Sequence, residues 1–113
     1  MASNPLTPIG EGFDLTTSYQ AIYTVSAGVA RAGIDAIVFN NYSSSNVTIS
    51  VRVSQSATHD VFDEIVTDRI IRANDNFLAP GLIGQALLTG GTIQALVSAN
   101  SSVSGKLTVT EIS

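Results

Sequence analysis

The sequence predicts an all-β fold, an antiparallel β-sandwich of the jelly-roll kind preceded by an extended amino-terminal arm. Apolar and polar residues alternate with a period of two in several segments, as in strands with one buried face. Roughly seven to nine such segments are separated by turns rich in Gly, Pro, Asn and Ser, which is typical of sandwiches and jelly rolls. The 113 residues fit one domain with a single core.

Residues 1–17 are predicted to form the arm and residues 18–113 the sandwich domain. Prolines and glycines interrupt the arm, and its periodicity is weak. It nevertheless carries Ile9, Phe13 and Leu15, and a free tail gains nothing from three apolar residues. We therefore take these three as candidate assembly contacts that dock either on this domain or on another subunit. A chain without residues 1–17 is then expected to fold.

The first half of the domain reads as three strands. Residues 19–25 form the first, and residues 34–39 form a nearly continuous apolar run that predicts a central strand buried on both faces. Residues 47–53 alternate most regularly, and the polar loop at 40–46 suggests a hairpin with the preceding strand. Residues 61–71 also satisfy helical spacing, but their β-branched residues favour two short strands.

The last quarter predicts a hairpin that closes the sandwich, from residues 92–98 to residues 106–112. Shorter extended pieces, at 77–78 and 83–88, precede it between turns. The alternation across the domain also predicts the residues of the core. They are Ile34, Val38, Val47, Ile49, Val51, Val53, Ile93, Val97, Leu107 and Val109.

Composition excludes several classes of function. The net charge is −4 and only five Lys and Arg residues are present, which argues against a nucleic-acid partner. The chain has no cysteine, so disulfides, thiolate zinc sites and cysteine nucleophiles are excluded. Its start lacks the pattern of a signal peptide, and no apolar run approaches about 18 residues, so we expect no membrane partner. The protein is expected to be soluble where it is made.

One patch combines a histidine with carboxylates, and we expect it to be a solvated loop or strand edge. His59 lies near Asp60, Asp63, Glu64 and Asp68, but alternate residues of a strand point to opposite faces and do not converge on a metal. No calcium loop, dinucleotide loop or serine elbow is present. We therefore predict no catalytic residue, no metal and no cofactor, and we read the three Asn-X-Ser/Thr sequons as surface loops.

From Tyr19 onward the order of segments resembles the small β-sandwich proteins of tailed bacteriophage virions, in particular the capsid decoration or cement proteins. The resemblance rests on residues 22–29, 36–41, 87–95 and 98–112. It implies a non-enzymatic virion protein, made in the host cytoplasm and seated on the capsid surface. Its implied partners are the major capsid protein and other copies of itself, most often in a homotrimer. Thr92 and the stretch 61–78 depart from the family pattern.

A binding module is the alternative, either a phage tail or fibre component or a carbohydrate-binding domain. Sugar binding uses rows of exposed aromatic side chains, and this chain has three tyrosines and no tryptophan. An enzyme comes third, because nothing in the sequence activates its many serines.

Overall fold

The computed structural model describes residues 6–55, 64–79 and 81–112, and every regular element in these ranges is a strand. The prediction of an all-β protein is therefore confirmed. No helix in the described part could cross a membrane. The strands are β1 (Leu6–Asp14), β2 (Gln20–Thr24), β3 (Arg31–Asn41), β4 (Val47–Ser54), β5 (Glu64–Ile71), β6 (Asn76–Leu78), β7 (Ala86–Leu88), β8 (Thr92–Val97) and β9 (Val103–Ile112).

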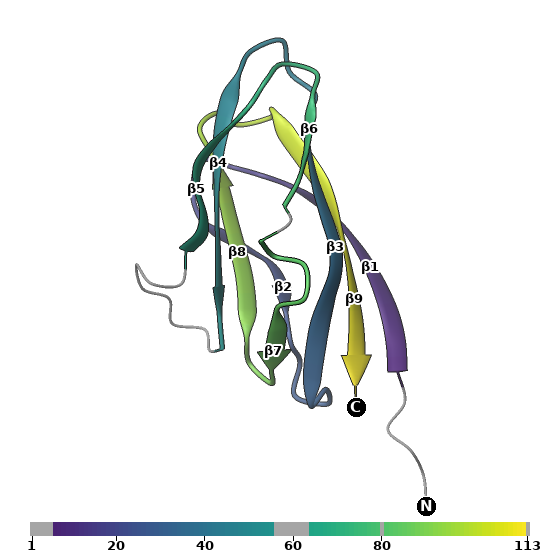
Figure 1. Ribbon diagram of the computed structural model, residues 1–113. Helices are drawn as coiled ribbons and strands as arrows, with labels where there is room; N and C mark the ends of the chain where they lie inside the picture. Colours follow the sequence, from purple (N-terminus) through teal and green to yellow (C-terminus); the bar gives the residue numbers. More distant parts are fainter. Residues whose placement is uncertain (1–5, 56–63, 80, 113) are drawn as a thin grey trace, which may run out of the picture.

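Two antiparallel sheets pack face to face as a sandwich (Figure 1). The first has the order β1-β9-β3-β6, with β7 also paired to β3, and the second has the order β2-β8-β4-β5. The pairs β1–β9, β2–β8, β3–β6/β7 and β4–β5 are nested along the chain. A ribbon of nested pairs rolled around one core is a jelly roll, which confirms the predicted architecture.

The two predicted hairpins are wrong. Strands β3 and β4 belong to different sheets, and so do β8 and β9. The loops that join them cross from sheet to sheet, and the buried Asn41 amide holds the first crossing. Its Nδ2 donates to the carbonyl oxygens of Ser45 and Ile71 at 2.8 and 3.0 Å. Alternation identifies the buried face of a strand but not the strand with which it pairs.

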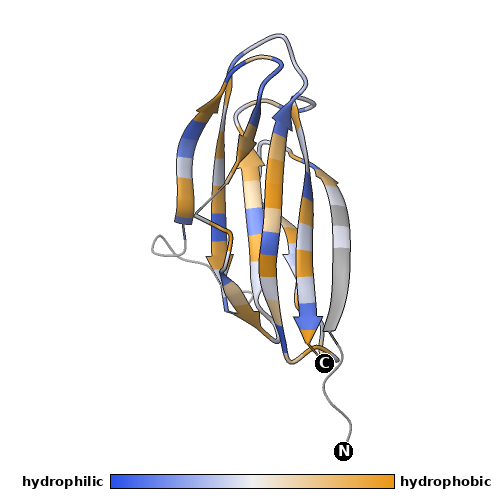
Figure 2. Ribbon diagram, turned by 45° about the vertical axis from the view of Figure 1, so that its right-hand side comes forward, coloured by the Kyte–Doolittle hydropathy of each residue, from blue (hydrophilic) through white to orange (hydrophobic). Residues whose placement is uncertain are grey.

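The core lies between the sheets and contains nine of the ten residues predicted for it. Figure 2 shows the alternation of apolar and polar residues that directs one face of each strand inward. The exception is Val38, which is half-buried. The prediction that this strand is buried on both faces is wrong, because β3 alternates between buried and exposed residues. Central strands of antiparallel sandwiches bury one face only.

A row of aromatic rings crosses the first sheet on its inner side. Phe13 of β1 and Phe39 of β3 both lie opposite Gly105 of β9, and Phe39 lies opposite Phe77 of β6. The ring centroids of Phe13 and Phe39 are 5.6 Å apart with an edge-on geometry, and those of Phe39 and Phe77 are 6.4 Å apart and stacked. Gly105 leaves the space that the Phe13 ring occupies.

The amino-terminal segment packs on its own sandwich. Residues 6–14 pair with β9 in unbroken register, Leu15 is 1% exposed, and Phe13 packs against the core. Of the two placements considered for this segment, the structure has the one on the same domain. Ile9 lies opposite Val109 in the register. A contact of Ile9, Phe13 and Leu15 with a neighbouring subunit stays a prediction.

Two short strands are predicted over residues 61–71; residues 64–71 form one strand, and residues 61–63 lie outside the described residues. The pairing of β5 with β4 shifts register twice, between Ile49 and Val51 and between Val51 and Arg52. Asp68 has a φ of 46° at the first shift, and its amide donates to the Ser50 hydroxyl at 3.0 Å. These bulges explain the mixed periodicity of the segment, because an extra residue interrupts the period of two.

Candidate functional site

Exposed apolar side chains gather on one side of the sandwich. Among the described residues six large hydrophobic side chains are exposed, and five of them belong to β5, β6, β7 or the turn between β6 and β7. We call these five the edge apolar surface; they are Ile65, Ile70, Leu78, Ile83 and Leu88. The sixth is Tyr42, in the loop after β3.

The jelly-roll topology places these residues on the same side. Strand β5 is the edge of one sheet, and β6 and β7 form the corresponding edge of the other (Figure 1). A short turn at residues 72–75 joins β5 to β6. Strands β6 and β7 pair with opposite ends of β3, so residues 76–88 run along that strand as an interrupted edge. Edges this short carry little regular pairing, and their side chains are correspondingly exposed.

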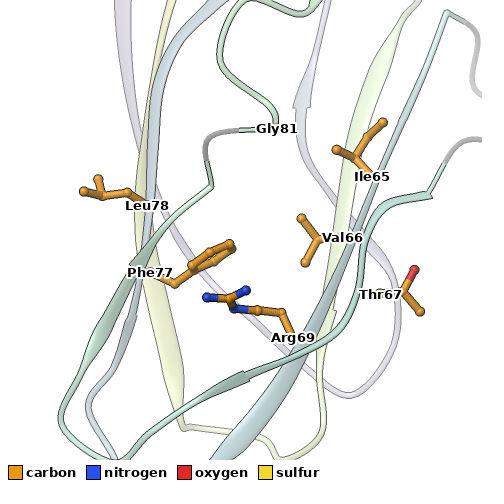
Figure 3. A pocket seen from close by; sticks show the side chains of 7 residues that line it. All are labelled: Ile65, Val66, Thr67, Arg69, Phe77, Leu78 and Gly81. Atoms are coloured by element: carbon orange, nitrogen blue, oxygen red, sulfur yellow. The ribbon is translucent and has the colours of Figure 1, made fainter.

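A groove of about 540 Å³ opens between these edges. Its lining residues are Ile65, Val66, Thr67, Arg69, Phe77, Leu78 and Gly81. Figure 3 shows Val66, Arg69 and Phe77 turned toward the groove, whereas Thr67 and Leu78 point away from it. Val66 and Phe77 pack against the core, so the floor of the groove is apolar.

Arg69 is the charged group of this groove. Its guanidinium carbon lies 4.6 Å from the centroid of the Phe77 ring, which is within the range of cation–π attraction. The arginine therefore covers the end of the aromatic row that starts at Phe13 on the opposite edge of the sheet. An apolar floor beside a planar cation can accept aliphatic or aromatic side chains and a carboxylate near them.

The described carboxylates of the predicted acidic patch have structural partners. Asp68 bonds to Ser50 at the β5 bulge, and Glu64 accepts a hydrogen bond from the Tyr19 hydroxyl at 3.0 Å. His59, Asp60 and Asp63 lie outside the described residues. Within the described ranges no three side chains of the metal-binding types lie together.

Tyr19 and Glu64 belong to a polar cluster on the outer face of the second sheet. The Arg52 guanidinium lies 3.8 Å from the centroid of the Tyr19 ring and donates to the Gln94 side-chain oxygen at 2.8 and 2.6 Å. Burial raises the pKa of the Tyr19 hydroxyl, and so does its hydrogen bond to Glu64. Because its groups are bonded to one another, this cluster ties β4, β5 and β8 to the residue before β2 rather than presenting reactive atoms.

The predicted contact residues and the edge apolar surface do not meet. Phe13 and Leu15 belong to the opposite edge of the sandwich, where β1 pairs with β9. The sequence reasoning missed Leu78, Ile83 and Leu88 as surface residues. The signal was present, because the sequence shows only short extended pieces at 77–78 and 83–88, and strands of three residues leave apolar side chains without a covering neighbour.

No protein-family model matches the sequence, and a search of the curated proteins finds no match. Solved structures resemble the fold. A chain in the structure of infectious bursal disease virus, Gx strain, aligns with a TM-score of 0.55 and 12% identity over 96% of this chain. The alignment covers 33% of the virus chain, so the present protein spans about a third of the length of the virus chain.

Two further structures resemble it over nearly the whole length of both chains. One comes from the endospore appendages of Bacillus, described as disulfide-linked pili, with a TM-score of 0.53, 12% identity and coverage of 97% of this chain and 87% of that chain. The other comes from the acid-stable capsid of Helicobacter pylori bacteriophage KHP30, with a TM-score of 0.49, 10% identity and coverage of 99% and 90%. At such identities these likenesses show the fold alone.

Proposed function

We propose that this protein is a structural virion component that decorates a phage capsid shell and stabilises it through oligomeric lattice contacts. The observation that carries the proposal is the edge apolar surface. Five large aliphatic side chains are exposed on one side of the sandwich, beside a groove with an apolar floor. Clustered apolar exposure on a small soluble domain marks a surface that another protein covers.

The fold is compatible with this role. Jelly rolls are frequent in viral capsids, although they also occur in lectins. Two of the similar structures, a virus chain and a pilus chain, belong to assemblies by their descriptions. The fold likeness does not transfer their functions, because one fold serves many functions. It supports the proposal only together with the exposed surface.

The proposed partners are two further copies of the chain and the major capsid protein. Complete burial of an exposed aliphatic side chain contributes about 1.5 to 3 kcal/mol, and the five are about half exposed, so covering them contributes about 4 to 8 kcal/mol. Association costs about 4 to 15 kcal/mol in lost freedom of motion. The edge apolar surface alone therefore supports a modest affinity, and contacts with the shell strengthen the homotrimer once it is bound.

A carbohydrate-binding module is a weaker candidate because the tyrosines form no exposed row. Tyr19 lies under Arg52, Tyr23 is buried, and only Tyr42 is exposed. The chain has no tryptophan that could replace them.

The test uses Leu78→Glu and Ile83→Glu, with Thr24→Glu as the matched control on the exposed face of β2. Native mass measurement is expected to find assemblies built from three-chain units for the wild type and the control, and no three-chain unit for the two variants. Shells prepared without this protein, from the virus that encodes it, are then mixed with each purified protein and heated. We expect the wild type and the control to raise the temperature at which the shells release their contents. A monomeric wild type that leaves this temperature unchanged would overturn the proposal.

A further inference from the structure

The sandwich has four sheet edges, and three of them are poorly suited to pairing with another strand. Strand β5 has two register shifts, β2 has five residues and a shift between Ala21 and Tyr23, and β6 and β7 have three residues each. Bulges and short edge strands are the usual devices that prevent edge-to-edge association. Strand β1 differs, because it pairs with β9 over nine residues without a shift.

We infer that residues 10–14 of β1 pair antiparallel with the same residues of a second copy, around a two-fold axis at Gly12. The hydrogen bonds of β1 determine which of its groups are free. The Leu15 amide donates to the Val103 carbonyl of β9 at 2.9 Å. In an antiparallel ladder bonded and non-bonded positions alternate, so the backbone groups of Gly10, Gly12 and Asp14 point away from β9. These groups form the free edge.

Pro8 limits the pairing at one end. It has the same parity as Gly10 and Gly12, so its nitrogen faces the free edge, where it has no hydrogen to donate. The free edge that can both donate and accept therefore begins at Gly10. At the other end the Asp14 carbonyl accepts a hydrogen bond from Gln20 Nε2 at 2.6 Å. A carbonyl oxygen has two lone pairs and can accept a second bond from an incoming strand.

The sequence of this edge is complementary to itself in the register centred on Gly12. With Gly12 opposite Gly12, Gly10 faces Asp14 and Glu11 faces Phe13, so no two acidic residues are opposed. Each of the three facing pairs exchanges two hydrogen bonds. A register centred on Glu11 would place two glutamates opposite each other, and opposed like charges destabilise a sheet. It would also place Pro8 of each copy opposite Asp14 of the other, and each of these two pairs would lose one hydrogen bond.

Charge favours a second copy over an unrelated strand. Lys106 of β9 lies opposite Gly12, is exposed, and forms no ion pair within the part of the chain that the structure describes. Standard strand spacings place its Cα about 12 Å from the Asp14 Cα of the second copy. Gly10 and Gly12 have no side chains, so the surface between Lys106 and Asp14 of the second copy is bare. A Cβ at either glycine would meet nothing within 4 Å. Lys106 of each copy can therefore reach Asp14 of the other.

This contact goes beyond the proposed function and does not depend on it. It joins the first sheets of two copies into one continuous sheet and uses the edge opposite to β6 and β7. A two-fold contact on one edge, combined with a three-fold contact through the edge apolar surface, would extend into a lattice.

Cysteine substitution tests the inference with a matched control, because the chain has no cysteine of its own. In the inferred register the two Gly12 Cα atoms are about 5.5 Å apart, which permits a disulfide. The two Gly10 Cα atoms are about 14 Å apart, which does not. We expect mild oxidation to link Gly12→Cys chains into dimers over a range of protein concentrations, and to leave Gly10→Cys chains unlinked. Lys106→Glu in the Gly12→Cys chain should lower the yield of dimer.

Two outcomes would overturn the inference: no dimer from Gly12→Cys, or equal yields from both variants, which indicates random collision. A mixture in which Gly10→Cys links mainly to Gly12→Cys would overturn the register. Circular dichroism of both variants, compared with the wild type, checks that each keeps the fold. The heated-shell assay is read separately, so that dimers without shell stabilisation contradict only the proposed function. Shell stabilisation without dimers contradicts only this inference.

Discussion

At the scale of single residues, the contact between Gly105 and Phe13 shows how much one missing side chain determines. A Cβ at Gly105 would clash with Phe13 Cζ and with the Val38 carbonyl oxygen. The carbonyl belongs to the backbone of the neighbouring strand and cannot move aside as a flexible side chain can. The aromatic row therefore depends on a glycine at this position.

We expect Gly105→Ala to destabilise the protein by about 1 to 3 kcal/mol, the usual cost of overpacking a core. Gly33→Ala on β3 is the control, since its Cβ would meet nothing within 4 Å. That change should be neutral or stabilise by up to about 1 kcal/mol. Urea unfolding midpoints measure both effects. Equal midpoints for the two variants would show that the Phe13 ring moves away at no cost.

Two valines test which face of each strand is buried. Val51 is 0% exposed, whereas Val38 is half-buried and lies opposite Lys106. Val51→Asp places an unpaired carboxylate in the core, at a cost of several kcal/mol, which we expect to unfold the domain. Val38→Asp should remain folded, with a loss below about 1 kcal/mol. Circular dichroism and thermal melts distinguish the two, and unfolding of both variants would contradict the assignment of Val38 to the outer face.

Tyr19 gives a prediction about pH. Burial and the hydrogen bond to Glu64 raise the pKa of Tyr19 from the ordinary value of 10.0. The folded protein therefore holds this proton more tightly than the unfolded chain does. The stabilisation from the hydroxyl is complete below pH 10.0 and is lost as pH rises through the folded-state pKa. The stability difference between the wild type and Tyr19→Phe should shrink at alkaline pH, and a constant difference would exclude this effect.

At the scale of elements, the sequence predicts strands well and their partners poorly. The regular alternation of residues 47–53 places Val47, Ile49 and Val51 in the core, as expected. It carries no information about the neighbouring strand, because the loops after β3 and β8 cross between sheets. Partner choice in a jelly roll depends on the nesting of the whole chain, which no local pattern encodes.

The bulged strand and the edge apolar surface were harder to predict for a related reason. Asp68 takes a left-handed backbone conformation, and the Ser50 hydroxyl bonds to its amide. These two residues are 18 positions apart, so a local pattern cannot reveal the bulge. Likewise Leu78 and Leu88 lie in segments that the sequence predicts as short extended pieces. Only the topology shows that no neighbouring strand covers their side chains.

Strand β1 is an element whose removal should now have a larger effect than the sequence suggests. Leu15 is 1% exposed, and its truncation to Ala alone is expected to cost about 2 to 5 kcal/mol. Removal of residues 1–17 takes away Leu15 and the whole of β1, including Phe13. Strand β9 then loses its neighbour on that side. We expect the shortened chain to be unfolded or aggregated, whereas Leu15→Met should stay folded. Circular dichroism compares them, and a shortened chain as stable as the wild type would show that β1 does not support the fold.

At the scale of the whole molecule, the two surfaces lie at opposite edges of the first sheet. The edge apolar surface lies on β5, β6, β7 and the turn between β6 and β7, and the free edge of residues 10–14 lies on β1. Each surface can therefore be covered without blocking the other. A domain with two independent contacts suits a lattice, where every copy touches several neighbours at once.

Assembly makes stability depend on protein concentration, because a partner that binds only the folded chain shifts the unfolding equilibrium. We expect the thermal midpoint of the wild type to rise with protein concentration. The double variant Leu78→Glu/Ile83→Glu removes two of the five side chains of the edge apolar surface, both of them solvent-exposed. Its midpoint at low concentration should match that of the wild type, and it should rise far less as the concentration increases. Calorimetry over a concentration series measures both curves. Parallel curves would mean that this surface plays no part in self-association, and a midpoint lowered at every concentration would mean that Leu78 and Ile83 stabilise the single chain instead.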